Sequence, residues 1–83
     1  MTSEKEKILD TLMSSSSFEI DNYLLVCKPC FIDKIIRYEY TVLKKLNDGQ
    51  YKRIYFYNNG IKRIDDIEKA QEIIDVARDI SGE

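Results

Sequence analysis

Two cysteines separated by two residues, in Cys27-Lys28-Pro29-Cys30, are the residues of this 83-residue chain whose types and spacing most directly suggest chemistry. Two thiols at this spacing can form a redox-active disulfide, and they supply half of the ligands of a four-thiolate zinc site. The chain has no histidine, which excludes Ser-His and Cys-His nucleophile pairs, His-containing metal sites and the usual general base. We therefore predict that the protein is not an enzyme.

The stretch YLLVCKPC, residues 23–30, resembles the redox pair of thioredoxin-like proteins, in which the first thiol sits at a helix N-terminus. That family also places a cis-proline against the disulfide, whereas Pro29 is the only proline of this chain. Four thiolates for zinc would require two chains to meet at the motif. Because the residues after the motif soon alternate as a strand does, we expect Cys27 and Cys30 to be two small apolar residues at a strand end, with no metal and no cofactor.

A second candidate site is the segment LKKLNDGQYKRIYFYNNGIKR, residues 43–63, which holds six cations and four aromatic residues. Bases of single-stranded nucleic acid stack on such rings while the cations neutralise phosphates. The same residues suit a protein partner, because tyrosine gives a large contact area and a basic rim steers acidic partners. We expect a partner-binding hairpin surface formed by Lys44, Lys45, Tyr51, Lys52, Arg53, Tyr55 and Tyr57.

The charge of the chain is unevenly distributed. Residues 31–64 carry eight cations and three acids, a net charge of +5, and residues 65–83 carry two cations and seven acids, a net charge of −5. The acidic segment lies within a Debye length of most of so small a domain and would repel phosphate, which favours a protein partner and leaves nucleic acid as the alternative. Its acids form a second partner-binding surface that would occupy the phosphate path of a nucleic-acid-binding enzyme: Glu68, Glu72, Asp75 and Asp79.

The elements before the hairpin follow from capping and periodicity. Ser3 and Glu6 form a capping box, and apolar residues then recur at helical spacing, which predicts a helix over residues 4–13. Ser14 to Ser17 reads as the turn that ends it. The apolar run after it predicts a strand from Tyr23 to Lys28 that stops at the Lys28-Pro29 step. Residues 31–35 begin either a helical turn or the next strand.

Alternation of apolar and polar residues from Ile36 to Val42 predicts a half-buried strand. Asp48-Gly49 suits the tight turn of a hairpin, and YKRIYFY is the returning strand. Asn58-Asn59-Gly60 repeats the turn chemistry before a short antiparallel piece at residues 61–64. In a regular register Val42 faces Tyr55, but a one-residue bulge would exchange the two sides, so the buried side of the hairpin stays open.

The last segment predicts a helix with Asp65 as its N-cap, Glu68 as the reciprocal partner, and Ser81-Gly82 at its end. Its apolar stripe contains Ile67, Ala70, Ile73, Ile74, Ala77 and Ile80. We therefore expect one α+β domain over residues 1–83: a helix, a three- or four-stranded antiparallel meander and a second helix, with both helices on one face of the sheet.

This order of elements resembles the double-stranded-RNA-binding domain. That family grips phosphates with a lysine-rich start to its second helix, where this chain has IDDIEKAQ, residues 64–71. Three acids in that stretch would oppose the contact, so the resemblance does not extend to function.

Small acidic chains of this size and layout resemble the inhibitors and host-takeover proteins encoded by phages and other mobile elements, including proteins that block nucleases or CRISPR complexes. The resemblance implies a non-catalytic module that binds and inhibits a host protein. The sequence has no apolar run near the ~20 residues of a membrane span and no secretory signal, so we expect the cytoplasm, that of the host for a phage protein, and no membrane partner. An exposed Tyr-rich sheet face is also able to pair with a second copy of the chain.

Overall fold

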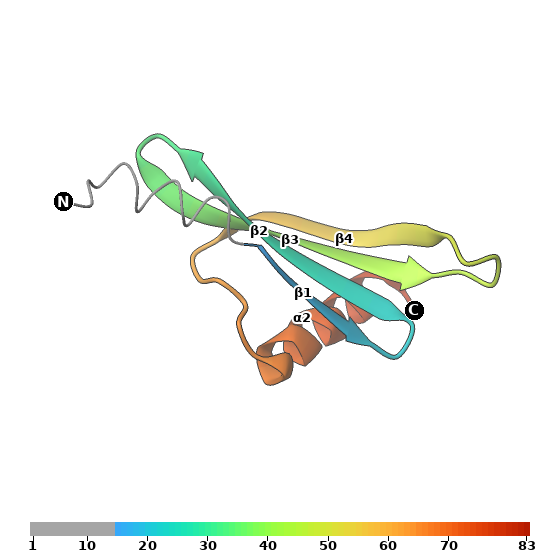
Figure 1. Ribbon diagram of the computed structural model, residues 1–83. Helices are drawn as coiled ribbons and strands as arrows, with labels where there is room; N and C mark the ends of the chain where they lie inside the picture. Colours follow the sequence, from blue (N-terminus) through green and yellow to red (C-terminus); the bar gives the residue numbers. More distant parts are fainter. Residues whose placement is uncertain (1–14) are drawn as a thin grey trace.

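A computed structural model describes residues 15–83 (Figure 1). They form a four-stranded antiparallel sheet in the order β1-β2-β3-β4, followed by one helix, α2. The elements are β1 (Ser16–Ile20), β2 (Tyr23–Ile32), β3 (Ile35–Lys45), β4 (Tyr51–Gly60) and α2 (Ile67–Ser81). The predicted α+β meander with a C-terminal helix is confirmed. The helix predicted over residues 4–13 lies outside the described residues, so only α2 is placed on the sheet.

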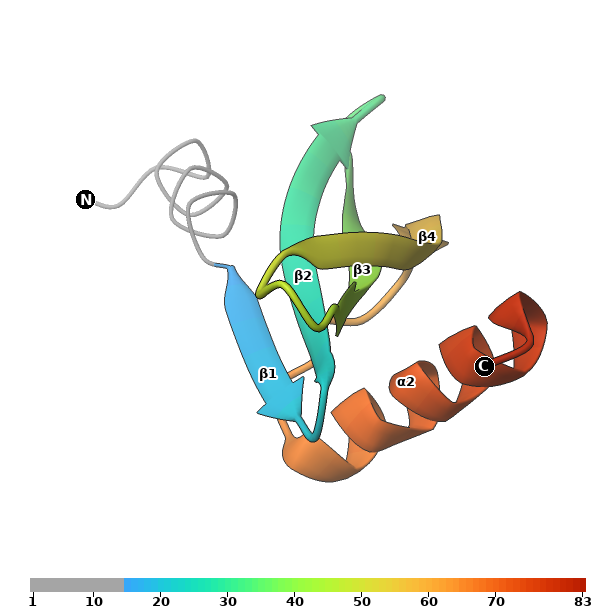
Figure 2. The same ribbon diagram turned by 90° about the vertical axis from the view of Figure 1, so that its right-hand side faces the viewer.

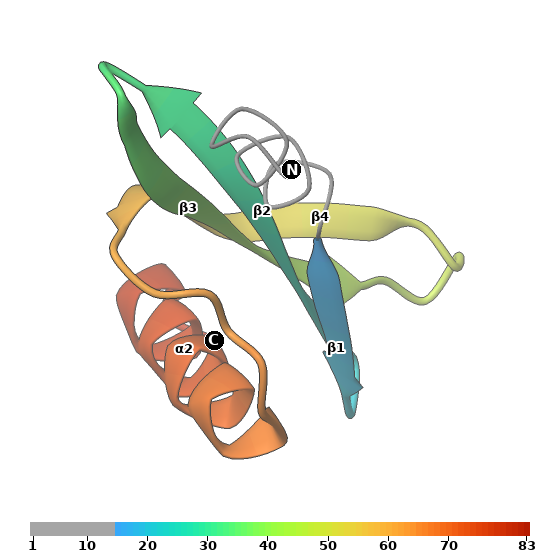
Figure 3. The same cartoon turned by 60° about the vertical axis from the view of Figure 1, so that its left-hand side comes forward.

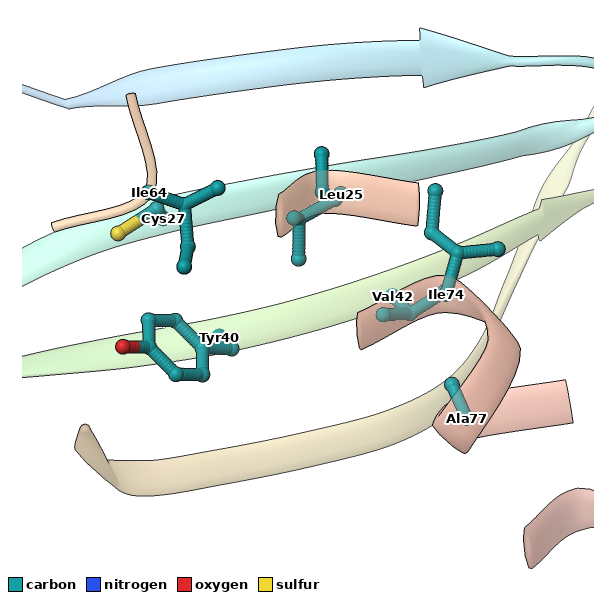
Figure 4. Packing of buried hydrophobic residues seen from close by; sticks show 8 residues of the cluster. Leu25, Cys27, Tyr40, Val42, Ile64, Ile74 and Ala77 are labelled. Carbon is teal, nitrogen blue, oxygen red and sulfur yellow. The ribbon is translucent and has the colours of Figure 1, made fainter. Parts of the chain in front are cut away.

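The core lies between α2 and one face of the sheet (Figure 2), which we call the α2 side; the opposite face is the far face. Leu25 and Val42, on neighbouring strands, are fully buried against Ile74 of the helix (Figure 4). Ala70 and Ala77 are also fully buried, and their small side chains let the helix approach the strands closely. Each large apolar side chain buried in this way stabilises the fold by about 1.5–3 kcal/mol.

The prediction that Ser14 to Ser17 form a turn is wrong for its second half, because Ser16 and Ser17 belong to β1. Ser16 lies opposite Cys27, and its hydroxyl donates a hydrogen bond to the backbone carbonyl of Ile64 (2.7 Å). This bond ties the start of β1 to the segment that leads into α2, which passes beside β1 in Figure 3. Serine, which local propensity assigns to turns, is therefore accommodated in this edge strand because its hydroxyl finds a backbone acceptor nearby.

The prediction that β2 stops before Pro29 is wrong, since β2 continues to Ile32 and Pro29 pairs with Tyr38. Lys45 N–H donates to the carbonyl of Asn22 (2.7 Å), so even-numbered residues of β2 direct their backbone groups to β3 and odd-numbered ones to the β1 side. The backbone of Pro29 is therefore directed to the β1 side. The β1–β2 pairing stops at Ser16 and Cys27, two residues before Pro29, so no described strand needs the N–H that proline lacks.

Residues 31–35, for which the sequence allows either a helical turn or a strand, form the tip of the β2–β3 hairpin. Asp33 and Lys34 have φ values of 52° and 65°. Two successive positive φ values form the two-residue turn that matches the twist of antiparallel strands.

The β3–β4 hairpin has a longer loop than the tight Asp48-Gly49 turn that was predicted. Leu46 N–H donates to Gln50 C=O (2.7 Å), and Gly49 N–H donates to Leu46 C=O (3.0 Å). Gly49 has a φ of 84°, whereas Asp48 does not have a positive φ. The result is a three-residue loop ending in a left-handed glycine, which moves the register at the tip by one residue.

The predicted turn at Asn58-Asn59-Gly60 is wrong, because β4 continues to Gly60, and residues 61–64 are irregular instead of a strand. The reason for glycine here is space. A Cβ atom at Gly60 would lie 2.5 Å from Cζ of Tyr40. The Tyr40 ring is buried, and its hydroxyl donates to the backbone carbonyl of Lys62, which fixes the path from β4 towards α2.

Helix α2 begins one residue later than predicted. Asp66 is the N-cap, and its carboxylate accepts a hydrogen bond from the backbone N–H of Lys69 (2.8 Å). Gly82 ends the helix in the left-handed conformation, with a φ of 76°, as the sequence indicated. The predicted apolar stripe is buried only in part: Ile67 and Ile80, at its two ends, are 61% and 67% exposed.

Replacing Gly60 by alanine is predicted to destabilise the fold by about 1–3 kcal/mol, because the added methyl overpacks against the buried ring of Tyr40. Chemical denaturation followed by circular dichroism measures this. Gly49→Ala is the matched control: nothing lies within 4 Å of its Cβ position, so its cost is only that of the positive φ, about 1 kcal/mol. In a Tyr40→Leu background the cost of Gly60→Ala should fall, and equal costs in both backgrounds would contradict the packing explanation.

Candidate protein interface

A β-bulge divides the predicted hairpin surface between the two faces of the sheet. Val42 lies opposite Tyr55 as the regular register predicts, but Leu43 lies opposite Arg53, and the register shifts between these two pairs. Ile54 is the extra residue. The seven predicted residues therefore do not form one surface: Lys45, Tyr51 and Arg53 lie on the far face, and Lys44, Lys52, Tyr55 and Tyr57 lie on the α2 side.

The far face carries an aromatic and cationic cluster at the hairpin tip, which we call the tip patch: Lys45, Tyr51, Arg53 and Phe56. Tyr51 and Phe56 are each 45% exposed. The Arg53 guanidinium lies over the Phe56 ring, 5.3 Å from its centroid. Exposed rings beside cations are the composition that protein interfaces favour.

The α2-side residues of the hairpin are less available to a partner. Lys44 lies opposite Lys52, and its ammonium group forms a salt bridge with Glu83 at the end of the chain. The hydrogen bond to Glu83 raises the pKa of Lys44. Arg78 lies over the ring of Tyr23, 5.1 Å from its centroid, at the same end of the helix.

Tyr55 and Tyr57 line a hollow of about 250 Å³ between β4 and the helix. We call it the β4–α2 groove, and its lining is Tyr40, Tyr55, Tyr57, Glu72, Ile73 and Val76. The Tyr40 and Tyr57 ring centroids are 6.0 Å apart, and burial raises the pKa of Tyr40. Tyr57 and Val76 remain 42% and 49% exposed, so the rim of the groove offers apolar surface to solvent.

The four predicted acids of α2, Glu68, Glu72, Asp75 and Asp79, are all exposed, and we call them the acidic stripe. Their spacing places them on the side of the helix away from its buried residues. Asp75 accepts a hydrogen bond from the side-chain amide of Gln71 (2.9 Å), and Glu72 also borders the β4–α2 groove. The acidic stripe and the tip patch lie on opposite sides of the sheet.

The two cysteines point to opposite faces of β2. Cys27 is buried in the core, and Cys30, three residues later on the same strand, is on the far face. Three residues of strand separate Cα atoms by about 10 Å, whereas a disulfide needs less than about 7 Å. Burial, followed by a hydrogen bond with Glu39, raises the pKa of the Cys30 thiol. The two thiols are therefore too far apart, and on different faces of the strand, to form the disulfide of a redox pair.

No group of three or more metal-ligating side chains is found among residues 15–83. No helix in the same range is long and apolar enough to cross a membrane. Comparisons with models of protein families, with curated proteins and with solved structures found no match. Function must therefore be inferred from the surfaces of the chain itself.

Three surface residues were absent from the predicted sites. Phe56 completes the tip patch, and Ile73 and Val76 line the groove. Phe56 was assigned to the side away from Tyr55 by alternation, but its association with Arg53 depends on the bulge. Ile73 was in the predicted apolar stripe, and nothing in the sequence indicates that β4 leaves space beside it.

In the native protein, Cys30 is predicted to react slowly with a thiol reagent and Cys27 not at all. A raised pKa lowers the thiolate fraction of Cys30 at neutral pH, and the core excludes reagent from Cys27. Absorbance assays with an aromatic disulfide should count one thiol before and two after unfolding, and none before unfolding in Cys30→Ser. An intramolecular disulfide found by mass spectrometry in the native protein would contradict the observed strand.

Proposed function

We propose that this chain is a non-catalytic protein-binding module that contacts an acidic surface of its partner through the tip patch. The observation that carries the proposal is the shared face of Lys45, Tyr51, Arg53 and Phe56, opposite the helix that carries the acidic stripe. The two rings supply rigid contact area, and the two cations supply attraction and orientation.

Charge on the far face supports a protein partner more than nucleic acid. Lys28 lies directly opposite Glu39 in the β2–β3 register, so its charge is offset by that of a neighbouring acid. The guanidinium of Arg53 already occupies one side of the Phe56 ring, where a base would stack. Glu19 adds a further acid on the β1 part of this face, and a phosphate backbone would have to pass it.

The acidic stripe gives a second contact on the opposite side of the same molecule. Four exposed carboxylates along one helix could occupy the phosphate path of a nucleic-acid-binding protein, as a competitor of the nucleic acid. In this form of the proposal the module is an inhibitor of a host nuclease or defence complex, of the kind that phages and other mobile elements encode.

Affinity capture from the source cell, read by mass spectrometry, tests the proposal with matched variants. Tyr51→Ser/Arg53→Glu changes only exposed side chains of the tip patch, so the fold should be unchanged while a specific partner is lost, with recovery reduced at least about tenfold. Conversion of the four stripe acids to lysine is the matched surface change on the other side.

A partner lost with the tip-patch variant and kept by the stripe variant supports the tip patch as the contact. The reverse pattern assigns the contact to the acidic stripe and rejects the tip patch. Equal recovery with wild type and both variants would reject both surfaces. Circular dichroism spectra of each variant verify that the comparison is between folded proteins.

Single-stranded nucleic acid is the alternative partner, favoured by the placement of the tip patch on the face away from the acidic stripe. We predict that fluorescence anisotropy detects no binding of labelled single strands even at low salt. Lys28 is offset by Glu39, and the other strand cations of the far face, Arg37, Lys45 and Arg53, are too few for a track of phosphate contacts. Binding that weakens steeply with salt and is abolished by Tyr51→Ser/Arg53→Glu would establish the alternative.

A further inference from the structure

The two edges of the sheet differ in their protection. β1 is five residues long, and the bond from Ser16 to Ile64 places another segment beside it. β4 is ten residues long and has no neighbour on its outer side within residues 15–83. Such an edge presents unpaired N–H and C=O groups that can pair with another strand.

The central part of β4 lacks the usual protection of an edge strand. Residues 54–58 contain no charge and no proline, and three of the five are aromatic. Register shifts lie on both sides of Tyr55–Tyr57, one beside Leu43 and one beside Tyr38. These irregularities limit the straight part of the edge to a short stretch, which also restricts the registers that a second strand can adopt.

The backbone N–H and C=O groups of Phe56 are directed to the free edge of the sheet, away from β3. Because Lys45 N–H donates to Asn22, odd-numbered residues of β3 direct their backbone groups to β2 and even-numbered ones to β4. The β4 partners of even-numbered residues, Tyr55 and Tyr57, therefore direct their groups to β3. Phe56, between them, directs its N–H and C=O to the outer edge.

We propose that the chain forms a two-fold symmetric dimer in which the β4 edges of two copies pair antiparallel about Phe56. This pairing places Phe56 opposite its own copy and Tyr55 opposite Tyr57 of the second copy, so three aromatic pairs cross the junction. Ile54 lies opposite Asn58 of the second copy. The cations Lys52 and Arg53 lie near the uncharged Asn59-Gly60 end, so no cation faces another across the axis.

The β4–α2 groove, which lies beside the β4 edge, also suits a second copy of the chain. The β4–α2 groove runs along β4 on the α2 side, with Tyr57 and Val76 exposed at its rim. The two-fold axis brings the grooves of both copies together, so each covers apolar surface of the other. Because the contact pairs β4 only with β4 of the second copy, the two-fold symmetry closes it, which gives a dimer instead of a fibre. The dimer does not require the partner of the tip patch.

Sedimentation equilibrium of the full chain, from about 1 µM to about 1 mM, tests the dimer. Wild type should approach twice the mass of one chain. Asn58→Pro removes an outward N–H at an edge position that proline tolerates, and Val76→Lys places a charge at the groove rim; each should weaken association at least about tenfold. Ile67→Lys is the matched control on the same helix: Ile67 is apolar and 61% exposed, against 49% for Val76, but lies outside the groove lining, so the change should leave association unchanged.

A disulfide trap tests the register. In a Cys30→Ser background, Phe56→Cys places two thiols opposite each other at a spacing that a disulfide accepts, so mild oxidation should yield a covalent dimer. Asn58→Cys is not opposite its own copy and should not crosslink.

A wild type that stays monomeric at about 1 mM, or association that Ile67→Lys weakens as much as Val76→Lys does, would overturn the dimer. A monomer that still captures its partner rejects this inference alone, and a dimer that captures nothing rejects the tip-patch proposal alone.

Discussion

The bulge at Ile54 is the constraint on which the surfaces of this protein depend. The core fixes Tyr40 and Val42 on the α2 side, and their partners on β4 must share that side. One extra residue of β4 between the core and the loop then exchanges the faces of the β4 residues nearer the tip, residues 51–53. Without it, Tyr51 and Arg53 would lie on the α2 side with Tyr55 and Tyr57, and the far face would have Lys45 and Lys52 at the tip, without Tyr51 and without the guanidinium over Phe56.

The loop chemistry explains why the bulge is where it is. The left-handed Gly49 closes a three-residue loop, which fixes the pairing of Lys45 with Tyr51. The core fixes a different register at Val42 and Tyr55. Because the two ends of the hairpin demand registers that differ by one residue, the mismatch has to be absorbed between them. The strand absorbs it at a single position, and this is why a regular alternation does not describe the hairpin.

Sequence patterns predicted the elements whose identity follows from local periodicity. The meander, the C-terminal helix and its glycine end all appear as expected, because alternation and capping are local properties. The errors lie where a residue type has two structural uses. Pro29 continues a strand because no strand within residues 15–83 needs its N–H, and Gly60 leaves room for a ring instead of making a turn. Both outcomes depend on contacts with distant residues, which composition alone does not specify.

The opposite charges of the two halves can coexist in so small a domain because the sheet separates them. The tip patch is on the far face, and the acidic stripe is on the outer side of α2, with the sheet and the core between them. Lys44 lies on the α2 side, where its charge is paired with that of Glu83. A partner that docks on the tip patch therefore meets cations, and one that docks on the acidic stripe meets carboxylates, although the whole chain has a net charge of only −2. This separation follows from the face that each strand residue occupies, and so again from the register of one hairpin.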